Sequence, residues 1–127
     1  IGKCLNLDKQ PGMCAKEPMT ADGIVRLSKI EVSPQHLNEY MKYAAEVGEV
    51  SLRTEPGVLT MYAVSEKKNP CKITILEIYA SREAYEKHIA SEHFQKYKQG
   101  TLHMVKSLVL ADQTPLNPAN KINNFIQ

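Results

Sequence analysis

Residues 73–97, ITILEIYASREAYEKHIASEHFQKY, contain the pattern that decides the fold. An apolar, β-branched run that begins at residue 72 and ends at Tyr79 is typical of a strand. Ser81 then suits the N-cap of a helix, and Ser91 suits the N-cap of a second helix. The stretch therefore predicts a strand followed by two short helices, and it also contains most of the candidate chemistry.

The rest of the chain predicts three more strands and one long helix. The strands are expected at residues 24–32, 58–64 and 102–111. Ser33 and Pro34 are expected to begin a helix that fades between Gly48 and Arg53. The order strand, helix, strand, strand, helix, strand is the ferredoxin-like βαββαβ arrangement of the α+β class. We expect a four-stranded antiparallel sheet with the helices on one face.

Composition indicates a single globular domain. The chain has 127 residues, of which 43% are apolar and 24% are charged. A net charge of +2 gives no argument for nucleic acid, and no apolar run approaches the roughly 18 residues of a membrane span. We expect residues 23–112 to form the domain, residues 1–22 an extended arm and residues 113–127 a tail.

The N-terminal residues leave localisation open between export to the periplasm and the cytoplasm. The chain begins at Ile1 instead of Met, which fits either a removed signal peptide or a start point chosen for expression. A disulfide between Cys4 and Cys14, or between Cys14 and Cys71, would suit an exported protein, and three free thiols are the alternative.

Several predicted strands are apolar on both faces, although the helices can cover only one face. An uncovered apolar sheet face is usually an interface. We therefore expect a homodimer packed sheet against sheet, with residues 122–126, which include Ile122, Phe125 and Ile126, docked on the partner.

Two motifs resemble the antibiotic biosynthesis monooxygenase superfamily of dimeric α+β barrel proteins. They are Glu55-Pro56-Gly57 and the run Glu77-x-Tyr79-x-Ser81-x-Glu83-Ala84-x-x-x-His88-x-x-x-x-His93-Phe94. The resemblance extends over residues 24–112 and is strongest to the quinol monooxygenases and the autoinducer-2-degrading protein. It implies oxygenation of a small electron-rich aromatic by O2 without metal or flavin.

The sequence departs from relatives of this superfamily at two places. Many relatives have Trp where this chain has Tyr79. The haem-degrading branch has Asn and an axial His at positions that hold Ser28 and Lys98 here, which makes haem degradation a minor alternative.

The candidate catalytic residues are His88, His93 and Glu77. Either imidazole could take a phenolic proton, and Glu77 in a strand between isoleucines could orient it. A structural role is the alternative for each of the three residues, because perturbed buried groups also occur in structural networks. The spacing of five between His88 and His93 is unlike a helical zinc pair, so no metal is expected.

The candidate substrate-binding residues are Arg26, Tyr79, Tyr62 and Phe94. Arg26 and Tyr79 would stabilise a developing oxyanion. The remaining histidines, His36 in a surface helix and His103 at the edge of the last strand, are expected to have no role in a site.

Two alternative functions remain open. One is isomerisation or breakdown of a small phosphorylated or carbonyl compound by the same residues. The other is a dimeric small-ligand binder without catalysis, which a pocket filled by large side chains would favour.

Overall fold

The computed structural model describes residues 13–116 of the chain. Its strands and α-helices are β1 (Ile24–Val32), α1 (Leu37–Thr54), β2 (Val58–Ser65), β3 (Lys72–Tyr79), α2 (Arg82–Ala90), α3 (Glu92–Thr101) and β4 (Val105–Gln113). Two short 3-10 helices, η1 (Pro34–His36) and η2 (Leu102–Met104), precede α1 and β4. The strands form a four-stranded antiparallel sheet in the order β2-β3-β1-β4, which confirms the ferredoxin-like α+β fold.

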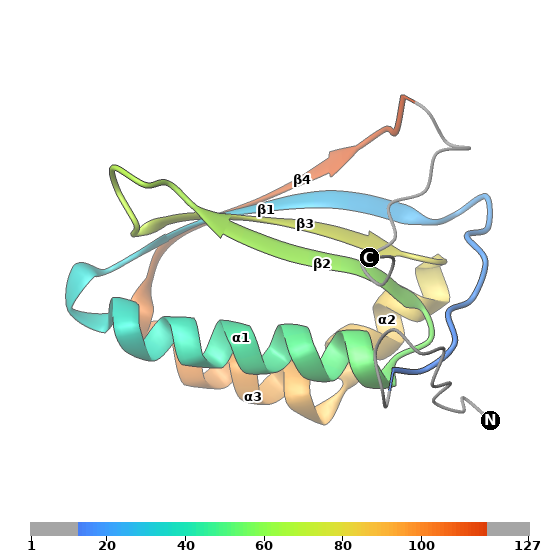
Figure 1. Ribbon diagram of the computed structural model, residues 1–127, viewed down its shortest axis with the longest axis horizontal. Helices are drawn as coiled ribbons and strands as arrows, with labels where there is room; N and C mark the ends of the chain where they lie inside the picture. The colour runs from blue at the N-terminus through green and yellow to red at the C-terminus, as the bar shows by residue number, and fades with distance from the viewer. Residues whose placement is uncertain (1–12, 117–127) are drawn as a thin grey trace.

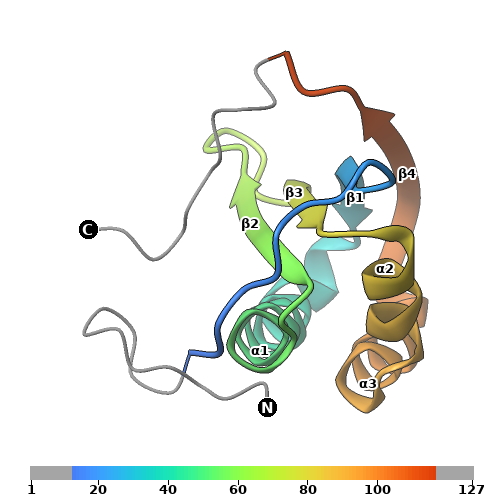
Figure 2. The same cartoon turned by 90° about the vertical axis from the view of Figure 1, so that its right-hand side faces the viewer.

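The helices form a layer on one face of the sheet, with α1 beneath β2 and β3, and α2 and α3 toward β4 (Figures 1 and 2). No helix of residues 13–116 covers the other face. That face carries Tyr62, Val64 and Val109, each at least half exposed. The apolar exposure agrees with the premise of the expected dimer, which stays a prediction.

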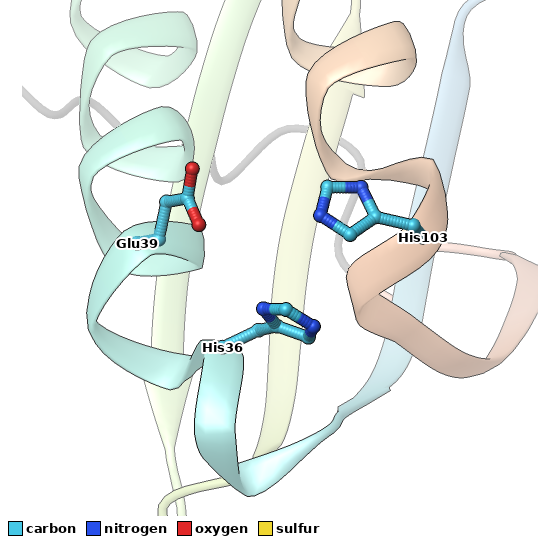
Figure 3. A group of neighbouring side chains, drawn as sticks. All are labelled: His36, Glu39 and His103. Carbon is cyan, nitrogen blue, oxygen red and sulfur yellow. The ribbon is translucent and has the colours of Figure 1, made fainter.

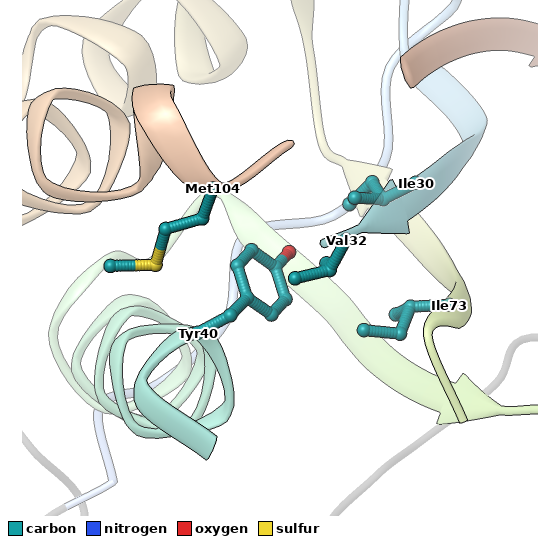
Figure 4. Packing of buried hydrophobic residues seen from close by; sticks show 5 residues of the cluster. All are labelled: Ile30, Val32, Tyr40, Ile73 and Met104. Atoms are coloured by element: carbon teal, nitrogen blue, oxygen red, sulfur yellow. The ribbon is translucent and has the colours of Figure 1, made fainter. Parts of the chain in front are cut away.

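The hydrophobic core lies between the sheet and α1, at the end where η1 and η2 meet (Figure 4). Its buried members are Ile30, Val32, Tyr40, Ile73 and Met104. Val32, Tyr40 and Met104 have no exposed surface. This core fixes both 3-10 helices against the sheet, and the other end of the helix layer is where α1 ends next to α2.

The long helix α1 ends later than the sequence indicates, since it continues through Gly48 to Thr54. A helical glycine costs about 1 kcal/mol relative to alanine. Burial of Val47 and of Ser51 on either side of Gly48 holds the helix through that position. The expected fading between Gly48 and Arg53 is therefore wrong, and the extra turn carries the chain to Glu55.

The last strand begins later than predicted, at Val105 instead of residue 102. Residues Leu102–Met104 form η2, because the side chain of Met104 enters the core and its carbonyl accepts a hydrogen bond from the Ser33 N–H at 2.9 Å. His103 is consequently on a 3-10 helix, and its expected place at the edge of the last strand is wrong.

The described part of the N-terminal arm runs in extended form past the end of α1 (Figure 2). The backbone N–H of Cys14 donates to Arg53 at 3.0 Å, and that of Thr20 donates to Ala80 at 2.8 Å. Cys14 is buried and forms no disulfide with Cys71, so that pairing is wrong. Cys4 and the residues 122–126 lie outside the described residues, and predictions about them stay predictions.

No helix within residues 13–116 combines the length and the apolar character that crossing a membrane requires.

Candidate active site

A cavity of about 560 Å³ lies between the sheet and the helices α2 and α3. The size falls in the range of about 300–1,000 Å³ that is usual for small-molecule sites. Its lining is mostly apolar and includes Ile30, Met61, Ile75, Phe94, Leu108 and Leu110. Strands β1 and β3 and helix α2 contribute Arg26, Ser28, Glu77, Tyr79 and His88 to the polar part of the lining, and further polar side chains come from α3 and β4.

His88 lines this cavity from helix α2 and is 2% exposed. The helix begins where Ser81 caps it, with the Ala84 N–H donating to the serine oxygen at 3.0 Å. This start places His88 on the inward face of α2, with its ring centroid 5.3 Å from that of Tyr79 and 5.1 Å from that of Phe94. The sequence prediction of an inward histidine above the third strand agrees with this arrangement.

The carboxylate that holds His88 comes from Glu55 and not from Glu77. One oxygen of Glu55 lies 2.9 Å from His88 Nδ1 and 2.5 Å from His93 Nε2. Glu55 is the C-cap residue of α1, so the extra turn of that helix positions it. The expectation that Glu77 orients the imidazole does not match this geometry.

The position of Glu55 at the C-terminal end of α1 indicates that it has binding partners, and the sequence alone does not reveal this position. The carbonyl end of a helix is negative, so a carboxylate there is unfavourable unless cationic or hydrogen-bonding groups compensate it. Two imidazoles provide the compensation here. In the sequence Glu55 stands out only as part of a turn before the second strand, because its partners are 33 and 38 residues away.

Glu55 remains ionised, and this fixes the protons on both imidazoles. Burial opposes ionisation, but the hydrogen bonds with His88 and His93 outweigh it and hold the pKa of Glu55 below its ordinary value. An ionised carboxylate only accepts hydrogen bonds, so Nδ1 of His88 and Nε2 of His93 must donate. The neutral form of His88 would therefore carry its lone pair on Nε2, which does not bond Glu55.

Gly57 allows the turn after α1 to approach α2 closely. A Cβ at Gly57 would collide with the Cβ of Ala84, one turn before His88. The turn is also fixed by the Ala80 N–H, which donates to the Gly57 carbonyl at 2.8 Å. The glycine therefore brings Glu55 within hydrogen-bonding distance of His88.

Glu77 belongs to a second polar group on the cavity wall. The Tyr79 hydroxyl donates to one of its oxygens at 2.6 Å, and the Ser28 hydroxyl donates to the other. Burial and the adjacent charge of Glu77 raise the pKa of Tyr79, which stays a neutral hydrogen-bond donor.

Arg26 lines the cavity as a fixed cation. Its Nε lies 2.7 Å from Asp112, and its guanidinium carbon is 4.7 Å from the centre of the Tyr85 ring. The hydrogen bond to Asp112 outweighs partial burial and raises the pKa of Arg26 further.

Two candidate residues do not line the cavity. Tyr62 is 62% exposed on the uncovered sheet face, because it pairs with Leu76 while its neighbour Met61 pairs with Glu77. Tyr62 therefore does not line this pocket, and its expected role in substrate binding stays a prediction that this geometry does not favour. His93 bonds the same oxygen of Glu55 but does not line the cavity. Of these two histidines, His88 is the one that lines it.

The donor atoms of Glu55, His88 and His93 lie within 4.8 Å of one another, which is close enough to consider metal ligation. The carboxylate oxygen and the two facing imidazole nitrogens are already paired with one another. The arrangement is complete as a hydrogen-bonded triad, which suits proton transfer.

Comparison with known proteins shows the family of this chain. Residues 23–100 match the profile of the antibiotic biosynthesis monooxygenase family. A crystal structure from Bacteroides thetaiotaomicron VPI-5482, assigned as an antibiotic biosynthesis monooxygenase, is 55% identical over 80% of this chain and 97% of that chain, with a TM-score of 0.78. The protein therefore belongs to the antibiotic biosynthesis monooxygenase family, and this membership indicates monooxygenase activity.

More distant structures share the fold. A protein from Lactobacillus acidophilus NCFM, assigned as a monooxygenase, is 27% identical with a TM-score of 0.72, over 76% of this chain but only 46% of that chain. A Caulobacter crescentus CB15 structure is 20% identical over 75% of this chain and 91% of that chain, with a TM-score of 0.70. A search of curated proteins gave no match.

Proposed function

We propose that the protein oxygenates a small electron-rich aromatic, a phenol or quinol, with O2 and without metal or flavin. The observation that carries this proposal is His88, whose Nδ1 is held by Glu55 while its ring lines a cavity of about 560 Å³. The cavity is open enough for a ligand, whereas Tyr40 packs in the core and Tyr62 lies on the other sheet face. This argues against a pocket filled by its own side chains.

The lining suits a flat aromatic ring. Phe94 and Tyr97 from α3 and Tyr79 from β3 contribute aromatic surface, and Met61 contributes an adaptable thioether. Burial raises the pKa of Tyr97, whose hydroxyl lies 2.6 Å from that of Tyr40. The tyrosine hydroxyls thus stay protonated and provide donors instead of competing phenolates.

His88 acts as the general base in this proposal. Its Nε2 takes the phenolic proton, and the Glu55 carboxylate stabilises the imidazolium that forms. Arg26 stabilises the phenolate oxygen by its positive charge. General-base catalysis of this kind contributes about 10²–10⁴-fold in rate.

The reaction balances without a cofactor. A phenol with hydrogen on the para carbon takes up one O2. One oxygen atom forms the new carbonyl of a quinone, and the other leaves as water with the phenolic and the ring hydrogens. The substrate supplies all the electrons, so the protein binds, deprotonates and excludes water.

A second candidate is isomerisation or breakdown of a small phosphorylated or carbonyl compound. Lys98 and Lys106 join Arg26 among the cavity-lining residues, which adds positive charge that the sequence alone does not indicate. Such a reaction would proceed unchanged under nitrogen, and this separates it from oxygenation.

We also propose a homodimer through the uncovered sheet face. Tyr62, Val64 and Val109 on that face are 62%, 50% and 54% exposed, which is unusual for large apolar side chains of a monomer. Light scattering at micromolar concentration should give the mass of two chains, and a stable monomer would contradict the dimer.

Oxygen uptake tests the proposed reaction. The wild-type protein with EDTA should consume O2 above the autoxidation blank for at least one member of a panel of quinols and hydroxylated polycyclic phenols. The double variant His88→Ala, His93→Ala should lose this uptake. Unchanged turnover in the double variant would contradict the assignment of the site, and no uptake across the panel would contradict oxygenation of this substrate class.

A further inference from the structure

We propose that His36, Glu39 and His103 form a surface binding site for a divalent transition-metal ion of the Zn²⁺ type. The three side chains come from η1, the first turn of α1 and η2, and they converge on the gap between these segments (Figure 3). Their donor atoms all lie within 4.8 Å of one another.

The two imidazoles lie close to each other. The His36 and His103 rings meet edge to face, with centroids 4.9 Å apart. Within residues 13–116, no side-chain hydrogen bond or ion pair engages either imidazole or the Glu39 carboxylate. All three groups are therefore available as ligands, unlike the paired imidazoles at Glu55.

The chemistry of the donor set selects the class of ion. Imidazole nitrogens favour Zn²⁺, Ni²⁺ and Cu²⁺ over Mg²⁺ and Ca²⁺, and two histidines with one glutamate are an established ligand set for zinc. Bonds of about 2.0–2.1 Å place the donors of a tetrahedral ion roughly 3.4 Å apart. Small rotations of these half-exposed and exposed side chains reach that spacing, and water completes the coordination.

The core beneath the site holds its backbone in place. Tyr40 follows Glu39 and Met104 follows His103, and both are fully buried in the same cluster (Figure 4). The hydrogen bond from the Ser33 N–H to the Met104 carbonyl ties η1 to η2 directly. A bound ion would therefore join the start of α1 to the junction of α3 and β4 with little cost in backbone order.

The site is distant from the Glu55 group, although the cavity lining extends to Thr101 and Leu102 beside His103. The α1 helix has 18 residues, and at 1.5 Å per residue it separates Glu39 from Glu55 by about 24 Å. Metal at the surface site should thus stabilise the fold without contacting the Glu55 group.

Calorimetric titration of the metal-free protein with ZnCl2 tests the proposal. The wild type should bind zinc, and His36→Asn, His103→Asn and Glu39→Gln should each weaken binding. Loss of an outer-shell partner alone costs about 10–100-fold in affinity, so loss of a ligand should cost at least about tenfold. Glu66→Gln, an exposed glutamate in the loop between β2 and β3, is the matched control and should bind like wild type.

A second titration separates this site from the Glu55 group. His93→Asn should retain the surface zinc site with unchanged affinity. Zinc binding that survives in His36→Asn and His103→Asn but disappears in His93→Asn would overturn the proposal, and so would no binding by the wild type. Circular dichroism in EDTA checks that each variant is folded, and the exposed Glu39→Gln gives an independent result if a histidine variant unfolds.

Discussion

Two groups of two histidines and one glutamate lie at opposite ends of the helix layer, and they differ in burial and in pairing. At one end, Glu55 accepts hydrogen bonds from His88 and His93, and His88 is 2% exposed. At the other end, the rings of His36 and His103 contact each other near Glu39, whose carboxylate has no hydrogen-bond or ion-pair partner within residues 13–116. The same residue types therefore suit proton transfer where a carboxylate is already bound, and metal ligation where the nitrogens are available.

Replacement of His88 should give the largest effect. His88→Gln removes the base and should lower kcat for quinol oxygenation by about 10²–10⁴-fold. Steady-state oxygen uptake measures the change, and Glu66→Gln serves as the control for expression and assay. A His88→Gln variant with wild-type kcat would show that the buried histidine group has only a structural role.

Removal of the Glu55 carboxylate should destabilise the fold more than removal of the Glu39 carboxylate. Glu55→Ala leaves two imidazoles without their acceptor, which should lower the free energy of unfolding by about 1–3 kcal/mol. Glu39→Ala removes an exposed carboxylate that has no such partner within residues 13–116, and it should change the free energy of unfolding by less than about 0.5 kcal/mol in EDTA. Urea unfolding of both variants measures the difference, and equal losses would contradict it.

The hydroxyl of Tyr79 should also contribute to the free energy of unfolding. Tyr79→Phe leaves one oxygen of Glu77 without a donor, so we expect a loss of about 1 kcal/mol in the free energy of unfolding. Tyr62→Phe, which removes the same atom from the exposed sheet face, is the matched control. A larger loss in the control than in Tyr79→Phe would refute the role of the Glu77 group.

The charge of Glu55 should give the smallest effect, visible as a pH dependence. The pKa of Glu55 in the folded protein is below its ordinary value of 4.5. Its ionised form therefore stabilises the fold above pH 4.5, and this contribution disappears as pH falls through the lowered pKa. The free energy of unfolding of wild type minus that of Glu55→Gln should shrink as the pH falls below 4.5, and a difference that grows on acidification below pH 4.5 would contradict the assignment.

The fold is predictable from the sequence because each element carries a local signal. Ser81 and Ser91 cap their helices as expected, through bonds to the N–H groups of Ala84 and Phe94. The start of β4 is not predictable in this way, because residues 102–104 are as apolar as the strand that follows and only the burial of Met104 distinguishes them.

The candidate site is predictable only in part, because some of its contacts depend on residues that are far apart in the sequence. The inward position of His88 follows from helical spacing, which is local. The partnership with Glu55 depends on the exact end of α1 and on the approach allowed at Gly57, and neither is visible in local spacing. The position of Tyr62 away from the cavity could not be predicted because β2 is apolar on both faces, so that alternation does not show which face meets the cavity.

The ionisation of a phenol bound in the cavity tests the central claim most directly. A chromogenic phenol, whose phenolate absorbs at longer wavelength than its neutral form, can be titrated with the anaerobic protein below the pH at which it ionises in water. The wild type should bind it as the phenolate, while His88→Gln should bind it as the neutral phenol. A neutral phenol in the wild type, or the same phenolate spectrum in His88→Gln, would contradict the role of His88 as the base.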